Sequence, residues 1–309
     1  MDTNIKHPIV SVLMPVFNCE LYVASAIESI LNQSFKDFEF IIIDDFSTDK
    51  SLKKINYYKD KRIKVLKKTR NSGISDSLNL GLKNAKGKYI IRMDADDVSL
   101  YNRIEKQVEF LDKNLDYVLC GSNFRILDTN VSRVLPESSD AIKVSFLRSC
   151  AICHPTVAFR KEILDNSNLF YDNDMEPAED YNLWTKLIQK SKFYNIQEEL
   201  LLYRIHKNQI TKKNSWTQHE KSFQIKLNFM RLILKDIDQK EIDILRKVLL
   251  TKEKIQLNEL LIFSKLCSNL EKGNEKEKQF EEFNFRLFLN GLKNKFLIIF
   301  FTKEERYSI

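Results

Sequence analysis

Three aspartates, Asp94, Asp96 and Asp97, directly follow the apolar stretch Tyr-Ile-Ile-Arg-Met. Asp94 and Asp96 are two residues apart, so on an extended backbone their side chains point to the same side. Carboxylates this close repel one another unless a cation lies among them. Two hard oxygen ligands on one side suit Mg²⁺ or Mn²⁺, which keep coordination positions open for substrate phosphates. The pattern predicts a divalent-metal site, although a solvated acidic turn could carry the same residues.

Two other apolar stretches also end in polar residues. Residues 9–16 precede a Phe-Asn pair, and residues 38–43 precede Asp44 and Asp45. A helix-like pattern follows in both cases. In a parallel α/β sheet all such strand ends lie along one edge, outside which ligands bind. The three stretches together predict a crevice for a metal ion and the phosphates of a nucleotide.

Strand and helix patterns alternate through the first part of the chain, which predicts an α/β fold with a mainly parallel central sheet. The expected strands cover residues 9–15, 38–44, 63–67, 89–93, 117–122 and 200–205, and the expected helices cover residues 22–33, 49–59, 75–84, 102–113, 140–148 and 178–190. A hairpin or a loop is expected at residues 124–135, with its turn at Asp-Thr-Asn. The acid pair Glu179-Asp180 begins the last of these helices, where the helix dipole alone would favour it.

The order of five short motifs carries a resemblance to a known family. They are Met-Pro-Val-Phe-Asn, Ile-Asp-Asp-Phe-Ser-Thr-Asp, Arg-Asn-Ser-Gly-Ile-Ser, Met-Asp-Ala-Asp-Asp and Ala-Glu-Asp-Tyr-Asn-Leu-Trp. In this order and spacing, the chain resembles the family 2 inverting glycosyltransferases over roughly residues 8–211. The resemblance implies the Rossmann-like GT-A fold and transfer of a sugar from a nucleotide sugar to a saccharide or glycolipid acceptor, as in bacterial surface-polysaccharide synthesis.

The resemblance assigns the metal, Mn²⁺ or Mg²⁺, to the Asp-x-Asp element. Asp96 is expected as a direct ligand and Asp94 as a contact to the ribose or the metal, with Ala95 between them. His206 closes a Tyr-Arg-Ile-His element that resembles one near the metal and diphosphate, and imidazole can ligate Mn²⁺ beside carboxylates. A structural histidine with ordinary hydrogen bonds is the alternative.

The nucleotide is expected to contact residues after the first three strands and at the Asp-x-Asp element. These are Pro15, Val16, Phe17, Asn18, Glu20, Asp44, Asp45, Arg70, Asn71, Asp94 and Ala95. The family usually has Tyr where this chain has Phe17, so that contact must use the ring or the backbone. Asp45 matches the family's base-binding acid and could accept the N3–H of uracil, which favours a UDP-sugar. Leu78-Asn79 departs from the Arg-Asn pair of many relatives.

The resemblance places the catalytic base at the pair Glu179-Asp180, most often at its second member, Asp180. A carboxylate there would take the proton of the acceptor hydroxyl. One base and one displacement imply inversion. His154, in a His-Pro pair, is expected on the acceptor side or as a structural histidine. A glycosidase also needs two carboxylates, but that class does not explain acids at strand ends beside a nucleotide-like turn.

Composition divides the chain into an N-terminal domain, residues 1–211, and a C-terminal helical region, residues 212–309. The latter has 20 Lys and Arg against 14 Asp and Glu, a net charge of +6 out of +7 for the chain. Its expected helices cover residues 215–235, 239–268 and 275–301, with Gly273 as a break. A stripe of Phe280, Phe283, Leu287, Phe288, Leu292 and Phe296 beside Lys293 and Lys295 predicts an amphipathic helix on a membrane surface; packing against the catalytic domain or a second subunit is the alternative.

Other classes are less well supported. No signal peptide, transmembrane run or nucleic-acid motif stands out, so the chain is expected to be cytoplasmic or peripheral on the inner face of the membrane. Five cysteines include one Cys-x-x-C pair, Cys150 and Cys153, without a second pair to complete a zinc site. A homo-oligomer is compatible with the sequence. A non-catalytic protein that binds nucleotide sugars or glycans on the same fold is the main alternative to an enzyme.

Overall fold

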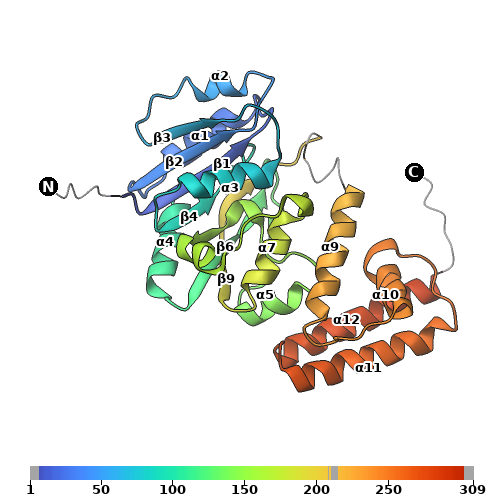
Figure 1. Cartoon of the computed structure of the whole chain (residues 1–309). Coiled ribbons are helices and arrows are strands. Elements are labelled where there is room, and N and C mark those ends of the chain that lie inside the picture. Colours follow the sequence, from blue (N-terminus) through green and yellow to red (C-terminus); the bar gives the residue numbers. More distant parts are fainter. Residues whose placement is uncertain (1–6, 208, 210–214, 303–309) are drawn as a thin grey trace. The chain divides into compact units, whose positions relative to one another are not determined.

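The computed structural model describes residues 7–207, 209 and 215–302 (Figure 1). The chain divides into two compact units, Met1–Ser139 with Ile152–Lys213 and Asp140–Ala151 with Asn214–Ile309. The predicted boundary between residues 211 and 212 falls outside the described residues. Asp140–Ala151 groups with the C-terminal helices, although it lies within the N-terminal domain expected from the sequence.

A mixed sheet of nine strands forms the centre of the first unit, in the order β3-β2-β1-β4-β8-β6-β9-β5, with β7 paired to β6. The strands are β1 (Val10–Val16), β2 (Phe38–Asp44), β3 (Ile63–Lys67), β4 (Tyr89–Arg92), β5 (Val98–Ser99), β6 (Tyr117–Ile126), β7 (Ser132–Arg133), β8 (Ala158–Arg160) and β9 (Lys192–Tyr203). β3, β2, β1 and β4 run parallel, and so do β6 and β9, whereas β8 is antiparallel to both neighbours.

Helices connect these strands in the first unit (Figure 1). They are α1 (Val23–Leu31), α2 (Ser51–Ile55), α3 (Ile74–Asn84), α4 (Arg103–Lys113), α6 (Lys161–Ser167) and α7 (Glu179–Leu187), with short turns η1 (His154–Thr156) and η2 (Asn173–Met175). In α1, Val23, Ala26, Ile27 and Ile30 repeat at helical spacing and are buried, which is the pattern of a helix packed on a sheet.

The residues of β1 and β2 explain why these strands lie in the middle of the sheet. Val10, Val12 and Met14 of β1 are fully buried, and so is Ile41 of the paired strand β2. Strands that are apolar on both faces must be covered on both, which is typical of parallel α/β sheets. The predicted α/β class with its GT-A-like sheet is confirmed.

Two strands are longer than predicted. The strand expected at residues 200–205 is the end of β9, which pairs with β6 along its whole length. β6 itself continues to Ile126 and forms the expected hairpin with β7, with Asp128 in the left-handed region at φ 61°. Both strands contain polar residues, such as Asn195, so the apolar runs in the sequence predict only part of each strand.

The second unit is helical. It contains α5 (Ser139–Ser145), α9 (Ser215–Met230), α10 (Gln239–Arg246), the π-helical η3 (Lys247–Thr251), α11 (Glu259–Glu277) and α12 (Glu282–Phe301). α11 and α12 run side by side (Figure 1), and the rings of Phe263 and Phe296 stack between them at 3.9 Å. Among the described residues no helix is long and apolar enough to cross a bilayer.

Two sequence predictions for this unit are wrong. The helix expected at residues 239–268 is broken, because the chain turns through Lys252 in the left-handed region at φ 58°. Gly273 does not break a helix but lies inside α11. A Cβ atom there would lie 2.1 Å from the carbonyl oxygen of Ile233, so glycine allows the backbone to approach the helix closely.

The aromatic stripe predicted to face lipid also needs correction. Four of its residues are buried in the second unit's own core, Phe280, Phe288, Leu292 and Phe296. Phe280 packs edge-on against Phe229 of α9 at 5.5 Å. A unit of about a hundred residues needs such side chains for its core, so most of the stripe is core, while Phe283 and Leu287 are exposed.

Candidate active site

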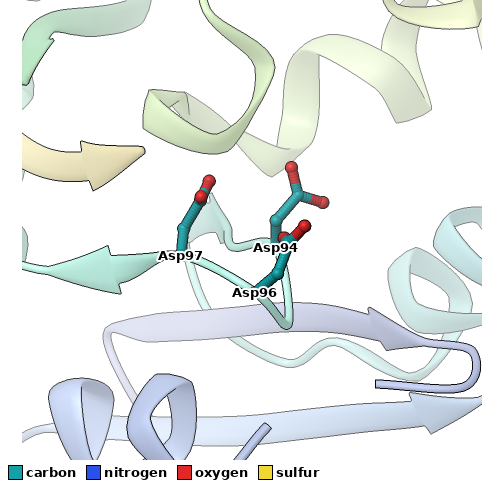
Figure 2. Close-up of side chains that lie close together, drawn as sticks. All are labelled: Asp94, Asp96 and Asp97. Carbon is teal, nitrogen blue, oxygen red and sulfur yellow. The ribbon is translucent and has the colours of Figure 1, made fainter. Parts of the chain in front are cut away.

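The three aspartates lie in the turn that follows β4. One carboxylate oxygen from each of Asp94, Asp96 and Asp97 falls within 4.8 Å of the others, and Figure 2 shows the side chains rising to the same side of the turn. The sequence predicted this convergence from the two-residue spacing of Asp94 and Asp96. The geometry therefore brings three hard oxygen ligands together.

Arg92, the last residue of β4, forms an ion pair with this cluster. Its side chain is 3% exposed, and its Nη1 lies 2.5 Å from Oδ2 of Asp94. Burial alone would lower the pKa of Arg92, but the charge and hydrogen bond of Asp94 raise it above its ordinary value. Burial, and then the nearby Asp96, raise the pKa of Asp94 although Arg92 opposes the rise. Arg92 therefore stays charged inside the site.

The segment after β9 closes the other side of the cluster. The backbone N–H of Arg204 donates to Oδ1 of Asp97 at 2.8 Å, and its Nε donates to the carbonyl of Asp96 at 2.7 Å. Nε2 of His206 lies 2.8 Å from Oδ2 of Asp96. The Tyr-Arg-Ile-His element therefore reaches the acidic turn, where the sequence placed it. Asp97 binds this segment and does not cap the turn that follows it.

The chemistry of this donor set fits a divalent cation. Oδ2 of the buried Asp97 has no hydrogen-bond partner among the described residues, and its pKa is raised well above the usual range by burial and then by Asp94. Two ligands in neighbouring positions of an octahedral ion lie about 3 Å apart. The spacing of Asp96 and His206 matches that separation, so carboxylates and one imidazole could share one ion.

The acid pair begins α7 and lies beside His154. Nδ1 of His154 is 4.0 Å from Oε1 of Glu179 and 3.9 Å from Oδ2 of Asp180, while its Nε2 lies 3.0 Å from the hydroxyl of Tyr171. Burial and then the charge of Arg92 hold the pKa of His154 well below its usual range. Inside the site His154 is therefore neutral, and the Tyr171 hydroxyl holds it beside the two acids.

The two acids of this pair differ in environment. The Glu179 side chain is 7% exposed and that of Asp180 21% exposed. Burial and then the neighbouring Asp180 raise the pKa of Glu179 to about 8, whereas burial, opposed by the backbone N–H of Tyr181, raises the pKa of Asp180 to about 6. Near neutral pH one proton resides mainly on Glu179, and Asp180 is the ionised and accessible member.

Helix α3 holds the segment in front of this pair. Asn79 exchanges two hydrogen bonds with the backbone of Tyr171, at 2.8 and 3.0 Å. The carboxylate of Glu176 accepts from the N–H of Ser75 at 2.5 Å and lies where a Cβ on Gly73 would be. Asn79 thus positions the Tyr171–His154 contact. The sequence predicted its helix, but at Asn79 it showed only a departure from the Arg-Asn pair of many relatives.

The loops after β1 and β2 bind each other. Oδ1 of Asn18 accepts from the N–H groups of Thr48 and Asp49, and Oε2 of Glu20 accepts from the N–H of Lys50 at 2.9 Å. Both residues, predicted to bind nucleotide, therefore fix the shape of this edge. Val16 is buried, whereas Phe17 beside it is half exposed. The ring of Phe17 is therefore available to a ligand.

Asp45 is largely occupied by the protein. It accepts from the N–H groups of Ser72 and Gly73, both at 3.0 Å, and from Nζ of Lys68 at 2.7 Å. A carboxylate accepts about four hydrogen bonds, so about one position is left for a base. The backbone amides of Ser72 and Gly73 in this turn therefore bind Asp45.

The remaining predicted residues lie around this edge. Asp44 is buried at the end of β2, and its Oδ1 has no partner within the described part of the chain. Arg70 and Asn71 are exposed in the loop after β3, Ala95 is buried within the acidic turn, and Pro15 is half-buried in β1. All of the predicted site residues belong to the first unit.

The sequence reasoning missed Arg92, Tyr171 and Arg204. Arg92 could have been found, because a charged residue inside an otherwise apolar strand is seldom buried without a partner. Tyr171 had no such signal, since its position depends on a contact between distant segments. Arg204 lies in the Tyr-Arg-Ile-His element that the sequence already placed near the metal.

Comparison with known proteins places this site in context. The model of the family described as glycosyl transferase family 2 matches residues 11–167. An uncharacterized glycosyltransferase of Haemophilus influenzae is 33% identical over 233 residues, which cover 71% of this chain and 72% of the relative. The O-antigen biosynthesis glycosyltransferase WbnJ of Escherichia coli is 34% identical over 223 residues, which cover 68% and 85%.

Two solved structures share the fold. S. aureus TarS in complex with UDP-GlcNAc has a TM-score of 0.63 at 17% identity, covering 94% of this chain and 89% of that one. The mannosyltransferase PcManGT from Pyrobaculum calidifontis, in complex with GDP-Man and Mn²⁺, has a TM-score of 0.58 at 14% identity, covering 95% and 88%. At these identities the likeness concerns the fold alone.

Proposed function

Because the chain belongs to glycosyl transferase family 2, we propose that it transfers a sugar from a UDP-sugar to a saccharide or lipid-linked saccharide acceptor with inversion, assisted by a divalent metal. One observation carries this proposal. The buried Arg92 lies 2.5 Å from Asp94 of the acidic turn, and the charge of Glu179, in the acid pair at the start of α7, also favours its charged form. The proposed metal ligands and the proposed general base are thus influenced by the same buried arginine.

The acidic turn would hold Mn²⁺ or Mg²⁺ through Asp96 and Asp94, with His206 as a further ligand. Bound there, such an ion supplies Lewis-acid stabilisation of the charge that develops on the diphosphate leaving group. Arg92 keeps the Asp94 carboxylate in place and prevents the like charges from repelling it out of position. Arg204 fixes the turn through Asp97 and the carbonyl of Asp96.

Asp180 is the general base of the proposal. With a pKa of about 6 it is ionised near neutral pH, yet basic enough to take a proton from the acceptor hydroxyl. Its partial exposure lets an acceptor approach. His154 contacts this pair and the Tyr171 hydroxyl, which supports a role on the acceptor side in orienting Asp180.

Inversion follows from the roles of the two acids. A retaining mechanism through a covalent intermediate needs a second, ionised carboxylate as nucleophile. Glu179 is more deeply buried and holds its proton near neutral pH, so it serves as a hydrogen-bond donor. A single displacement with Asp180 as base then gives the inverted product.

A UDP-sugar is the preferred donor for two reasons. Asp45 keeps about one acceptor position, enough for the single N3–H of uracil, and the fold neighbour TarS is described with UDP-GlcNAc. The fold neighbour PcManGT is described with GDP-Man, so guanosine donors are the competing choice. The half-exposed Phe17 would offer its ring to the nucleotide.

The relatives also support a cellular role. WbnJ is described as an O-antigen biosynthesis enzyme, so we assign this chain to surface-glycan assembly, with the chain at the cytoplasmic face of the membrane and in peripheral contact with it. Growing surface glycans are commonly carried on lipids, which makes such a position useful. Self-association is compatible with this role.

A panel of UDP-, GDP- and dTDP-sugars with Mn²⁺ tests the proposal. We expect release of nucleoside diphosphate from a UDP-sugar, loss of release in excess EDTA, and an inverted anomeric centre in the transferred product by NMR. Tight donor binding without turnover for any donor and acceptor would favour the alternative, a non-catalytic nucleotide-sugar-binding protein.

A further inference from the structure

Four cations from four segments of the second unit lie around one region. They are Arg148 after α5, Lys226 in α9, Lys252 at the end of η3 and Lys295 in α12. η3 packs against both α9 and α12. The guanidinium carbon of Arg148 lies 3.6 Å from where a Cβ on Gly291 would be, one helical turn before Lys295. This is an ordinary contact distance, so the guanidinium of Arg148 lies against α12.

The lysines of this cation cluster lack a balancing acid. Burial and then the charge of Lys295 lower the pKa of Lys226 to about 8, and burial followed by Lys252 and Arg148 lowers that of Lys295. None of the four pairs with a carboxylate within the described ranges, whereas neighbouring cations such as Lys247 do. Lys226 and Lys295 are half-buried, whereas Arg148 and Lys252 are exposed. Like charges that are partly buried are unfavourable unless an anion joins them.

Large apolar side chains are exposed at the same end of the α11–α12 hairpin. Leu261 is 80% exposed and Ile298 is 66% exposed. Phe263 is two residues from Leu261 in the sequence, and Phe296 is two residues from Ile298. The stacked rings of Phe263 and Phe296 align the two helices there. Leu257 and Phe301 are each 75% exposed. Exposed apolar residues beside unpaired cations are typical of surfaces that enter a lipid headgroup layer.

We propose that the cation cluster, together with these exposed apolar residues, binds the phosphate headgroups of an anionic lipid bilayer. The inference rests on the peripheral location proposed above and names the surface responsible. It differs from the aromatic stripe predicted from the sequence, most of which is core. The charge of the cluster is complementary to an anionic leaflet, and its lack of internal acids leaves the phosphates as its counterions.

Vesicle co-sedimentation of the full-length chain at low ionic strength tests this site. The vesicles are phosphatidylcholine with or without phosphatidylglycerol. The cluster variant is R148Q/K252Q/K295Q, and the control K240Q/K272Q/K276Q removes the same charge from exposed positions of α10 and α11. Donor hydrolysis is measured in every sample, because none of these positions belongs to the proposed active site.

We expect the wild type to bind only the phosphatidylglycerol vesicles. Each basic group near an anionic leaflet strengthens binding about fivefold, so the cluster variant should bind at least about tenfold more weakly, while the control stays within about threefold of the wild type. Donor hydrolysis should be unchanged in both variants, which shows that they fold.

Three results would overturn the proposal. The wild type could ignore anionic vesicles, or both variants could lose binding equally, which would indicate general charge attraction. Alternatively, calorimetry could show that the wild type binds inorganic pyrophosphate through the cluster while ignoring vesicles, so that the site takes a soluble phosphate. Because donor hydrolysis is followed separately, failure of the lipid site is distinguished from failure of the proposed transfer reaction.

Discussion

The two groups of acids in the first unit are built from the same residue types but lie in different environments. In the acidic turn, Asp96 contacts His206 and is partly open to solvent, and Asp94 has a charged partner in Arg92. In the acid pair, Glu179 and Asp180 are close to the neutral His154, and no cation of the described residues contacts them directly. The first group is arranged to hold a positive charge and the second to hold or release a proton.

This difference shows how burial and partners divide the work among carboxylates. Carboxylates that converge without enough cations create a site for a metal ion. Carboxylates buried beside one another share a proton, so that one becomes a base with a pKa near the operating pH. Arg92 pairs with Asp94, and its charge also opposes the rise that burial causes in the pKa values of Glu179 and Asp180, so it partly offsets the negative charge of both groups. The following predictions test this division, from the largest effect to the smallest.

Replacing the proposed base should have the largest effect. Asp180→Asn keeps the shape of the side chain but cannot accept a proton, so kcat should fall about 10³-fold to 10⁴-fold. Initial rates of transfer with saturating donor and acceptor measure this fall. A loss below about tenfold would remove Asp180 from the role of base.

Replacing the proposed metal ligand should have the next largest effect. Asp96→Ala removes the carboxylate that contacts His206, and kcat should fall roughly 10²-fold to 10³-fold because the leaving group loses electrostatic stabilisation. The response of the remaining rate to added Mn²⁺ should also weaken. Asp128→Ala, in an exposed turn, is the control and should behave as the wild type. Normal Mn²⁺ dependence in Asp96→Ala would contradict the metal role.

Removing the shared arginine should affect folding as well as activity. Arg92→Met leaves Asp94 and Glu179 in a buried site without their cation, which should destabilise the chain by about 3 kcal/mol. Urea unfolding followed by circular dichroism measures this change. The exposed Arg70→Met is the matched control and should change stability by less than about 0.5 kcal/mol. Equal stability of the two variants would mean that Arg92 is not needed to balance the acids.

The acid pair should also set the pH dependence. Asp180 must be ionised to act, and its pKa is raised to about 6, so kcat should fall as the pH drops through that value, about tenfold for each further pH unit. A pH series of kcat between mild acid and neutral pH tests this limb. A rate that stays constant down to pH values near the ordinary range of aspartate would show that Asp180 does not titrate as the base.

The smallest effect is expected at the neighbouring acid. Glu179 holds a proton near neutral pH because its pKa is raised to about 8, and a glutamine closely resembles a protonated glutamate. Glu179→Gln should therefore retain kcat at neutral pH within about threefold. A loss as large as that of Asp180→Asn would assign the ionised role to Glu179.

Much of this arrangement could be predicted from the sequence, because strand ends in parallel sheets share one edge. That rule was enough to bring Asp45, Asp94 and Asp96 to the same side. The contacts that complete the site could not be predicted, since Tyr171 reaches His154, and Arg204 reaches Asp97, only through the packing of distant segments. The buried stripe of α12 was misread because hydrophobic periodicity indicates an apolar face but not what covers it.

The central claim is that the acidic turn binds the metal and diphosphate while the acid pair acts on the acceptor. Calorimetric titration of UDP with Mn²⁺ into Asp96→Ala and Asp180→Asn tests it most directly. We predict that Asp180→Asn binds UDP within about twofold of the wild type, since its loss lies in the transition state, and that Asp96→Ala loses the Mn²⁺-dependent part of binding. Equal loss of UDP affinity in both variants, or none in Asp96→Ala, would contradict the division of roles.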